Sequence, residues 1–307
     1  MPVTLRAQCI GSLALRALSN GNSVLAGQVV NTFSNSFYLK TRGDELVFVT
    51  NRSLRSPITI NLDATFNLEQ LVKPMELVRV NGKELHLGTD TMIEFSAAAL
   101  YQDHAEPARG LRPEFTKIDK SLHLISFVLR IIDTSQSVLD RHALAHPSLV
   151  DFVSDGVMPL RHPGTETRFR EAALKIVGSG SGFTPSGDDT MGGFLATYNS
   201  FVRTIGRAPI LLDSKLLEEK TSWISAKLLD YMQRLILDEQ LQRLIDSANK
   251  NEDDLVTALE TLLPRGHTSG IDIAVGSILA LSLIRDIAFE KEETEIVARA
   301  LGLRGPA

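Results

Sequence analysis

The sequence contains only one cysteine, Cys9, and this scarcity limits the class of protein. A single thiol cannot form a disulfide within the chain, and it is typical of a protein kept in a reducing compartment. The N-terminus has no basic segment followed by an apolar run, which argues against a signal peptide. The longest mainly apolar stretch, residues 273–284, is shorter than the roughly 20 residues of a membrane-spanning helix. We therefore expect a cytoplasmic protein with no membrane as its partner.

The chain also lacks a basic tract and any excess of positive charge. Its 32 Lys and Arg residues stand against 37 Asp and Glu residues, which gives a formal net charge of −5. A protein that binds nucleic acid as its main partner needs clustered Lys and Arg, so we expect no nucleic acid. With 307 residues, 43% hydrophobic and 22% charged, the composition predicts an ordinary globular protein of two domains or one large one.

The spacing of apolar residues changes along the chain and predicts an α+β protein of two domains. Residues 1–105 contain seven short β-prone runs separated by turn signals, among them the hairpin signal Asn81-Gly82. They predict a small barrel or sandwich, preceded by a helix near Leu13 to Leu18. The polar segment 106–113 holds two prolines and marks the boundary. Beyond it the apolar period becomes about 3.6, so residues 114–307 are expected to form a mainly helical domain. The helices expected there cover 118–132, 165–177, 188–205, two or three segments within 212–245, then 253–263, 271–289 and 292–301.

A glycine-rich stretch stands out in the helical part: residues 178–189 read Gly-Ser-Gly-Ser-Gly-Phe-Thr-Pro-Ser-Gly-Asp-Asp. Alternating glycines fit neither a helix nor a well-packed strand, and they leave backbone N–H groups accessible. Ser186 is a good N-cap for the helix that follows, whose first turn carries two carboxylates. Such a loop predicts a site for a phosphate-like anion, a metal, or both. The ligand-binding residues expected in it are Gly178, Gly180, Gly182, Thr184, Ser186 and Gly187.

Two familiar glycine motifs are excluded for this loop. No Lys-Ser or Lys-Thr follows the glycines, so the loop is not a Walker A motif. The segment before Gly178 is helical in character rather than β, which is the wrong context for a dinucleotide fingerprint. No organic cofactor is therefore indicated.

A second stretch, residues 265–272, repeats part of the first. Ser186 to Gly193 and Ser269 to Gly276 both read Ser-Gly-x-Asp-x-x-x-Gly. Asp and Gly four residues apart lie on one helix face, and glycine there allows another backbone to approach closely. We expect the two helices to cross near these glycines, with Asp189 and Asp272 facing one pocket and His267 at its rim. Thr268, Ser269 and Gly270 then join the expected ligand-binding residues.

A plainer interpretation is that each motif is a capping box, in which the fourth residue bonds back to the N–H of the cap. Glycine inside a helix costs about 1 kcal/mol relative to alanine, however, and a cap does not require it. Nor does a cap require the preceding Gly-Ser-Gly-Ser-Gly or His267. The combination favours a site.

Residues 182–189 together with Gly-His-Thr-Ser-Gly at 266–270 resemble a bacterial family that includes the AllH-type subunit of oxamate carbamoyltransferase, from anaerobic allantoin breakdown. That family usually has Leu where this chain has Phe183 and Ser where it has Thr268. The stretch Arg55-Ser56-Pro57-Ile58 and the β-rich start are also similar. The resemblance implies a subunit of a complex that phosphorolyses oxalurate to oxamate and carbamoyl phosphate. Its partners would be other enzyme subunits and a small anionic substrate, either carbamoyl phosphate or phosphate plus a carboxylate.

Carbamoyl transfer needs two anions held together and a stabilised carbonyl oxygen, rather than a protein nucleophile. We expect Arg265 to clamp a carboxylate or phosphate and His267 to act as general acid or oxyanion donor, beside Asp189 and Asp272 in the catalytic set. Asp188, Asp189 and Asp272 would repel an anion unless a hard cation lay between them, so we expect them to hold Mg²⁺. Two interpretations stay open for Thr221, Ser222 and Ser225: hydroxyls that reach the site, or surface hydroxyls, which we favour.

Two other functions remain open for the same residues. One is a non-catalytic regulatory subunit that binds a nucleotide or acyl phosphate. The other is a hydrolase that uses a metal-bound water at the aspartates.

Overall fold

The computed structural model describes residues 3–19, 25–63, 66–102, 113–133, 135, 137–139, 147–202 and 204–300, with side chains as far as Phe289. The chain divides into two compact units. The first comprises Met1–Glu106 and the short segment Ile236–Glu239, and the second comprises Pro107–Leu235 and Gln240–Ala307. Residues 103–112, which include most of the predicted boundary segment, lie outside the described residues. Within the described ranges no helix combines the length and the apolar character needed to cross a membrane.

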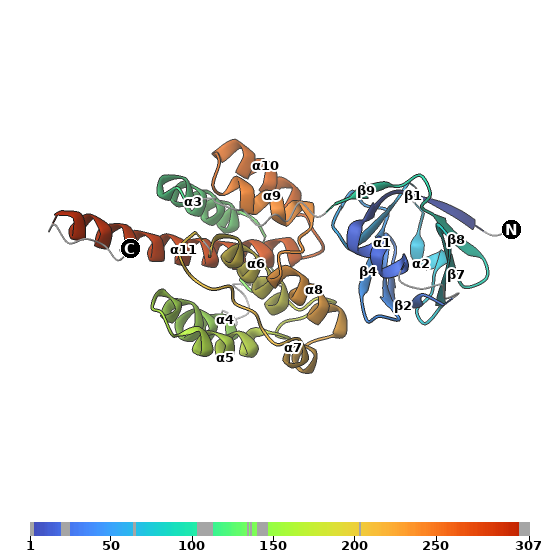
Figure 1. The fold of residues 1–307 in the computed structure, drawn as a ribbon, viewed down its shortest axis with the longest axis horizontal. Coiled ribbons are helices and arrows are strands. Elements are labelled where there is room, and N and C mark those ends of the chain that lie inside the picture. Colours follow the sequence, from blue (N-terminus) through green and yellow to red (C-terminus); the bar gives the residue numbers. More distant parts are fainter. Residues whose placement is uncertain are drawn as a thin grey trace. The chain divides into compact units, whose positions relative to one another are not determined.

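The first unit is a closed β-barrel, drawn in blue to green in Figure 1. The sheet order among the described strands is β5-β4-β3-β2-β6-β7-β8-β1-β9, and β1 also pairs with β5. That pairing closes eight strands into a barrel, with β9 added beside β1. The predicted barrel-or-sandwich start is therefore a barrel. The strands are β1 (Val3–Gly11), β2 (Gly27–Phe33), β3 (Ser36–Thr41), β4 (Leu46–Thr50), β5 (Thr59–Leu62), β6 (Leu77–Asn81), β7 (Glu84–Leu87), β8 (Thr91–Glu94) and β9 (Ala99–Tyr101).

Strand β1 closes the barrel, and the sequence did not predict it. Its first half pairs in parallel with β8, from Val3 opposite Thr91 to Arg6 opposite Glu94. Its second half pairs antiparallel with β5, with an irregularity between Ala7 and Cys9. The helix expected near Leu13 exists as α1 (Ser12–Ser19), but it follows this first strand instead of preceding all strands. α1 and the short α2 (Leu68–Leu71) pack Ala14, Leu18 and Leu68 into the barrel core.

The loop between β4 and β5 is held rigidly by side chains of β5. The Asn61 amide donates to the carbonyl oxygens of Arg52 and Leu54, at 3.1 and 2.8 Å. The Thr59 hydroxyl oxygen accepts from the backbone N–H of Ser56 at 2.9 Å. These bonds satisfy backbone groups that a loop would otherwise leave to water, so the loop has a defined shape.

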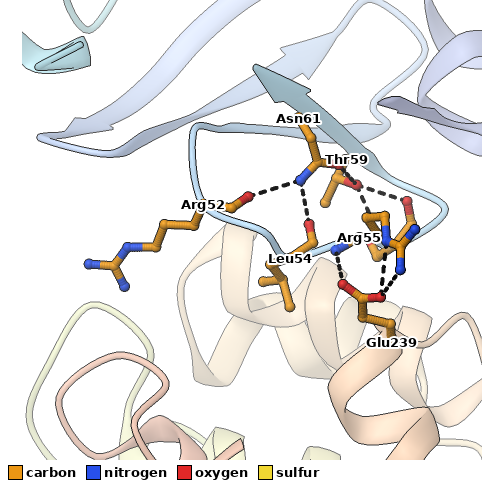
Figure 2. A network of polar contacts seen from close by, with 7 residues as sticks. Arg52, Leu54, Arg55, Thr59, Asn61 and Glu239 are labelled. Atoms are coloured by element: carbon orange, nitrogen blue, oxygen red, sulfur yellow. Dashed lines mark hydrogen bonds and ion pairs between the residues drawn. The ribbon is translucent and has the colours of Figure 1, made fainter. Parts of the chain in front are cut away.

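This loop holds Glu239, as Figure 2 shows. The Arg55 guanidinium donates to Glu239 Oε2 at 3.0 and 2.7 Å, and the Arg55 backbone N–H donates to Oε1 at 3.1 Å. In return the Glu239 N–H donates to the Arg55 carbonyl oxygen at 2.9 Å. The segment 236–239 therefore belongs to the first unit although it comes late in the chain.

The second unit is helical, as predicted. Its elements are α3 (Phe115–Ile131), α4 (Pro147–Asp151), the π-helical η1 (Phe152–Val157), the 3₁₀ turn η2 (Met158–Arg161), α5 (Glu166–Ile176), α6 (Ser186–Phe201), α7 (Ser214–Lys220), α8 (Trp223–Gln233), α9 (Glu239–Ser247), α10 (Glu252–Leu262) and α11 (Ser269–Ala300). Only the last two predicted helices are wrong, because 271–289 and 292–301 form one helix, α11. The charged stretch 290–293 consists of Glu and Lys, which are good helix formers and do not interrupt it.

Helix α6 lies in the interior of the second unit. All of its 16 residues are buried, and it crosses α11, the long red helix of Figure 1. Phe194 of α6 stacks on Phe169 and Tyr198, with ring centroids 5.1 and 5.9 Å apart, and meets Phe152 edge-on. This aromatic cluster fixes α6 in place directly after Gly193.

Candidate functional site

The helices α6 and α11 cross where the sequence predicts. A Cβ on Gly193 would clash with the carbonyl oxygen of Ile273, and a Cβ on Gly276 would clash with that of Thr190. Both glycines are therefore required for backbone-to-backbone contact, which a larger residue would prevent. Because the glycines lie one turn after Asp189 and Asp272, this contact brings the two helix starts together.

The two helix starts have the same backbone arrangement. In α6 the N–H groups of Asp188 and Asp189 donate to the Pro185 carbonyl oxygen, at 2.9 and 3.2 Å. In α11 the N–H of Asp272 donates to the Thr268 carbonyl oxygen at 3.0 Å. Ser186 and Ser269 are the first helical residues, so the prediction of Ser186 as N-cap is off by one position. Each start leaves backbone N–H groups without a partner in its own helix and a partial positive charge of about half a unit.

Asp189 lies between its own loop and the start of α11. The Thr184 hydroxyl donates to Asp189 Oδ2 at 2.9 Å and lies 3.3 Å from the Ser269 hydroxyl. Burial raises the pKa of Asp189 to about 7, opposed by hydrogen bonds from Ser269 and Thr184 and by the charge of Arg265. The neighbouring Asp272 charge raises this pKa further. At neutral pH the Asp189 carboxyl therefore keeps a proton part of the time.

Asp272 is wholly buried, with 0% of its surface exposed. Its Oδ1 accepts from the backbone N–H of Val138 at 2.7 Å. Burial raises the pKa of Asp272 to about 6, opposed by Val138 and by the hydroxyls of Ser186 and Thr268. Neither hydroxyl reaches Oδ2 in hydrogen-bond geometry, and that oxygen has no partner within the described part of the chain. Thus Ser186 of α6 lies near Asp272 of α11, and Ser269 of α11 lies near Asp189 of α6.

Asp188 has a different position from the other two aspartates. Its Oδ1 accepts from the Gly178 N–H at 2.7 Å, and its Oδ2 accepts from the Thr221 hydroxyl. Burial raises the pKa of Asp188, and these hydrogen bonds oppose the shift. Asp188 therefore ties the start of the glycine loop to the residue after α7.

Of the hydroxyl residues after α7, Ser222 is exposed as the sequence suggested, whereas Thr221 is half-buried and Ser225 is buried. Thr221 bonds to Asp188, and Ser222 accepts from the Ser225 N–H as the cap of α8. The sequence held no signal for the Asp188–Thr221 contact or for Val138, because both pairings join segments far apart in the chain.

The glycine loop needs its glycines for two reasons. Gly178, Gly180 and Gly182 have φ values of +79°, +100° and +114°, a region that residues with a Cβ rarely adopt. A Cβ on Gly187 would clash with the carbonyl oxygen of Ile176, so this glycine allows a close backbone approach. Residues 180–182 are exposed, which leaves this part of the loop open to a ligand.

The turn before α11 contributes two side chains with different surroundings. Arg265 is half-buried, and its charge lowers the pKa of Asp189. His267 is exposed and makes no hydrogen bond or ion pair with any other described residue. The predicted residues that the structure brings together are Thr184, Ser186, Asp189, Arg265, Thr268, Ser269 and Asp272.

Among the side chains that the structure describes, no group of three or more His, Cys, Asp or Glu residues could hold a metal ion. Both oxygens of Asp188 already accept hydrogen bonds, so Asp189 and Asp272 are the two carboxylates left at the crossing. Mg²⁺ usually takes six oxygen ligands in octahedral geometry, and this set alone is incomplete for it.

The fold and the site define a protein of two unlike units: a closed eight-stranded barrel, and a helical unit in which two Ser-Gly-x-Asp helix starts meet. The model of the AllH family N-terminal domain matches residues 5–100, and the family model described as oxamate carbamoyltransferase subunit AllH matches residues 176–281. The chain therefore belongs to the AllH family. No curated protein and no solved structure was found to match it. The first match covers the barrel strands, and the second covers both helix starts and both crossing glycines.

Proposed function

We propose that this chain is a subunit of a carbamoyltransferase that phosphorolyses oxalurate to oxamate and carbamoyl phosphate, with its anions bound where α6 and α11 cross. The observation that carries the proposal is the backbone contact at Gly193 and Gly276, which brings the two helix starts together and places the hydroxyls of Thr184 and Ser269 3.3 Å apart. The description of the family as an oxamate carbamoyltransferase subunit supports the reaction.

The crossing offers donors for anions without any lysine. The two helix N-termini bring their partial positive charge to one region, and the exposed backbone of residues 180–182 lies beside the start of α6. Arg265 supplies a planar fork of N–H donors that suits a carboxylate or phosphate. Holding two anions side by side in this way removes much of the entropic barrier to a reaction between them.

Asp189 is suited to move the proton that the reaction requires. A phosphate oxygen attacks the carbamoyl carbon of oxalurate, and the bond from that carbon to the oxamate nitrogen breaks. The proton of the attacking hydrogen phosphate must reach that nitrogen for atoms to balance. A carboxyl with a pKa of about 7 can accept and donate a proton at neutral pH, so we assign this relay to Asp189. His267, exposed on the turn before α11, is the second candidate donor.

The test is to assemble the full chain with its partner subunits and measure carbamoyl phosphate formation from oxalurate at increasing phosphate concentrations. Asp189→Asn should lower kcat at least about 100-fold, the usual effect of losing a general acid–base group. Asp253→Asn, on the exposed side of α10, is the matched control and should leave kcat unchanged. Product formation that does not depend on phosphate would instead indicate hydrolysis. An unchanged kcat in Asp189→Asn would indicate a regulatory subunit.

Mg²⁺ stays a prediction of the sequence, and no step above depends on it. The same assay tests it by chelation with EDTA followed by addition of Mg²⁺. Activity that is lost and then restored would support a cation held by Asp189 and Asp272. Activity that survives chelation would contradict one.

A further inference from the structure

The helical unit contains an internal structural repeat. The helices α5 and α10 both have 11 residues, and each is followed by a loop and then by a helix that starts with Ser-Gly-x-Asp. A Cβ on Gly187 would clash with the carbonyl oxygen of Ile176, the last residue of α5. A Cβ on Gly270 would clash in the same way with that of Leu262, the last residue of α10.

The two loops close with the same pair of backbone hydrogen bonds. Ser179 donates to Ile176 at 3.0 Å and accepts from Gly187 at 2.9 Å. Arg265 donates to Leu262 at 2.9 Å and accepts from Gly270 at 3.1 Å. Ser179 and Arg265 are therefore equivalent positions in the two copies.

The copies differ in length at one place. Nine residues, 177–185, join α5 to α6, whereas six residues, 263–268, join α10 to α11. Since Ser179 matches Arg265 and Ser186 matches Ser269, the three extra residues lie between Ser179 and Ser186. Residues 180–182, Gly-Ser-Gly, are the exposed part of that interval. One copy thus has three extra residues with exposed backbone after Ser179, and the other has the guanidinium of Arg265 at the position that matches Ser179.

The crossing relates the two copies reciprocally. Gly193, four residues after Asp189, contacts Ile273, the residue after Asp272. Gly276, four residues after Asp272, contacts Thr190, the residue after Asp189. Ser269 lies beside Asp189, where both are near the Thr184 hydroxyl, and Ser186 lies beside Asp272. The site is therefore two half-sites related by an approximate two-fold axis, each with one helix start.

A second observation points to a ligand independently of the helix ends. Asp272 is wholly buried, its Oδ1 is fixed by Val138, and its Oδ2 has no donor among the residues described. A buried acceptor without a donor is costly, and such atoms call for an explanation. An N–H group of a carbamoyl moiety is the donor that both substrate and product of the proposed reaction would bring.

We propose that the two half-sites bind unlike anions, with phosphate held by residues 180–182 and the start of α6, and a planar carboxylate held by Arg265 and the start of α11. This inference rests on the proposed carbamoyl transfer. The extra open backbone can offer N–H groups to a tetrahedral anion from several sides, while the flat guanidinium matches a carboxylate edge to edge. The carbamoyl group then lies between the anions, with its NH₂ donating to Asp272. Both substrates are bound together, so the reaction proceeds through a ternary complex.

The test removes one half-site at a time in the assembled enzyme. Deletion of residues 180–182 gives the first loop the length of the second, which already spans equivalent helix ends, so the fold should survive. We expect the KM for phosphate to rise at least tenfold, while the KM for oxalurate changes less than twofold. Arg265→Gln should have the opposite effect. Acetyl phosphate, which has a methyl group in place of NH₂, should inhibit at least tenfold more weakly than carbamoyl phosphate.

Thermal unfolding checks that the deletion variant is folded, and Arg265→Gln gives an independent readout if it is not. Equal effects of either variant on both KM values would overturn the assignment, as would no effect on either. Calorimetry with inorganic phosphate separates this inference from the proposed reaction. Phosphate binding that the deletion abolishes would support the subsite even if oxalurate is not turned over. Failure of the wild-type complex to bind phosphate would overturn it.

Discussion

At the scale of single residues, the buried aspartates predict how stability depends on pH. The pKa of Asp189 is about 7 and that of Asp272 is about 6 in the folded chain, against about 3.9 for Asp in an unfolded chain. Between these values the folded state binds more protons than the unfolded state, so the free energy of unfolding falls as pH rises. We expect the melting temperature to decrease from pH 5 to pH 8.

Asp189→Asn should flatten this dependence, because asparagine does not ionise at the buried position. The free energy of unfolding of the variant minus that of wild type should be larger at pH 8 than at pH 5. Each unit by which the Asp189 pKa is raised contributes at most about 1.4 kcal/mol to this change. Thermal unfolding of the full chain across this pH range measures the slope. Asp253→Asn, at an exposed position, should keep the wild-type slope. If Asp189→Asn kept it as well, the raised pKa would be contradicted.

At the scale of elements, the crossing of α6 and α11 depends on the absence of two side chains. Gly276→Ala places a Cβ against the backbone of Thr190, which cannot move without shifting the whole helix. We expect a loss of about 1–3 kcal/mol or more in the free energy of unfolding, larger than the helix propensity that alanine gains. Gly192→Ala is the matched control, because its Cβ would clash with the flexible side chain of Met232 and with no backbone atom. Urea unfolding compares them, and equal losses would mean that the close crossing is not required.

Most elements were predictable because their side-chain pattern is local. The strands β2 to β8 and the helices α3, α5, α6 and α10 follow alternating or helical apolar spacing within one segment. Two strands were missed. β1 alternates buried Leu5 and Ala7 with exposed Arg6 and Gln8, so its local strand signal was overlooked, whereas its pairing with strands far along the chain leaves no local signal. β9 has three residues, two of them exposed, and so has no apolar alternation.

The candidate site divides in the same way. The repeated Ser-Gly-x-Asp-x-x-x-Gly pattern predicted that Gly193 and Gly276 meet, since both lie one turn after an aspartate. The separate position of Asp188 was not predictable, because Thr221 becomes its partner only in the folded unit. Val138 contacts Asp272 through its backbone N–H. Almost every residue type has this group, so the sequence could not predict the contact.

At the scale of the whole molecule, the boundary of the first unit is not one point in the sequence. Residues 236–239 belong to the first unit, and the ion pair of Arg55 and Glu239 joins them to it. No change in composition marks this segment in the sequence. The Arg55 side chain is 52% exposed, so we expect Glu239→Gln to cost only about 0.5–1 kcal/mol. Hydrogen exchange should be up to about fivefold faster at residues 236–239 in this variant. Asp44→Asn, which breaks an exposed pair with Lys40, should leave that exchange unchanged. Unchanged exchange in Glu239→Gln would show that the ion pair does not hold the segment.

The crossing of α6 and α11 also sets an order of synthesis. Thr184 and Ser269, which meet at the site, are 85 residues apart in the chain. The barrel strands that the structure describes all lie before residue 102, so a nascent chain can pair them long before α11 leaves the ribosome. Contacts of such high sequence separation form late, since a long loop must close first. A chain whose synthesis stops between α10 and α11 would contain the described barrel strands but only one of the two half-sites. The chain therefore gains the capacity to bind both anions only when α11 has been made.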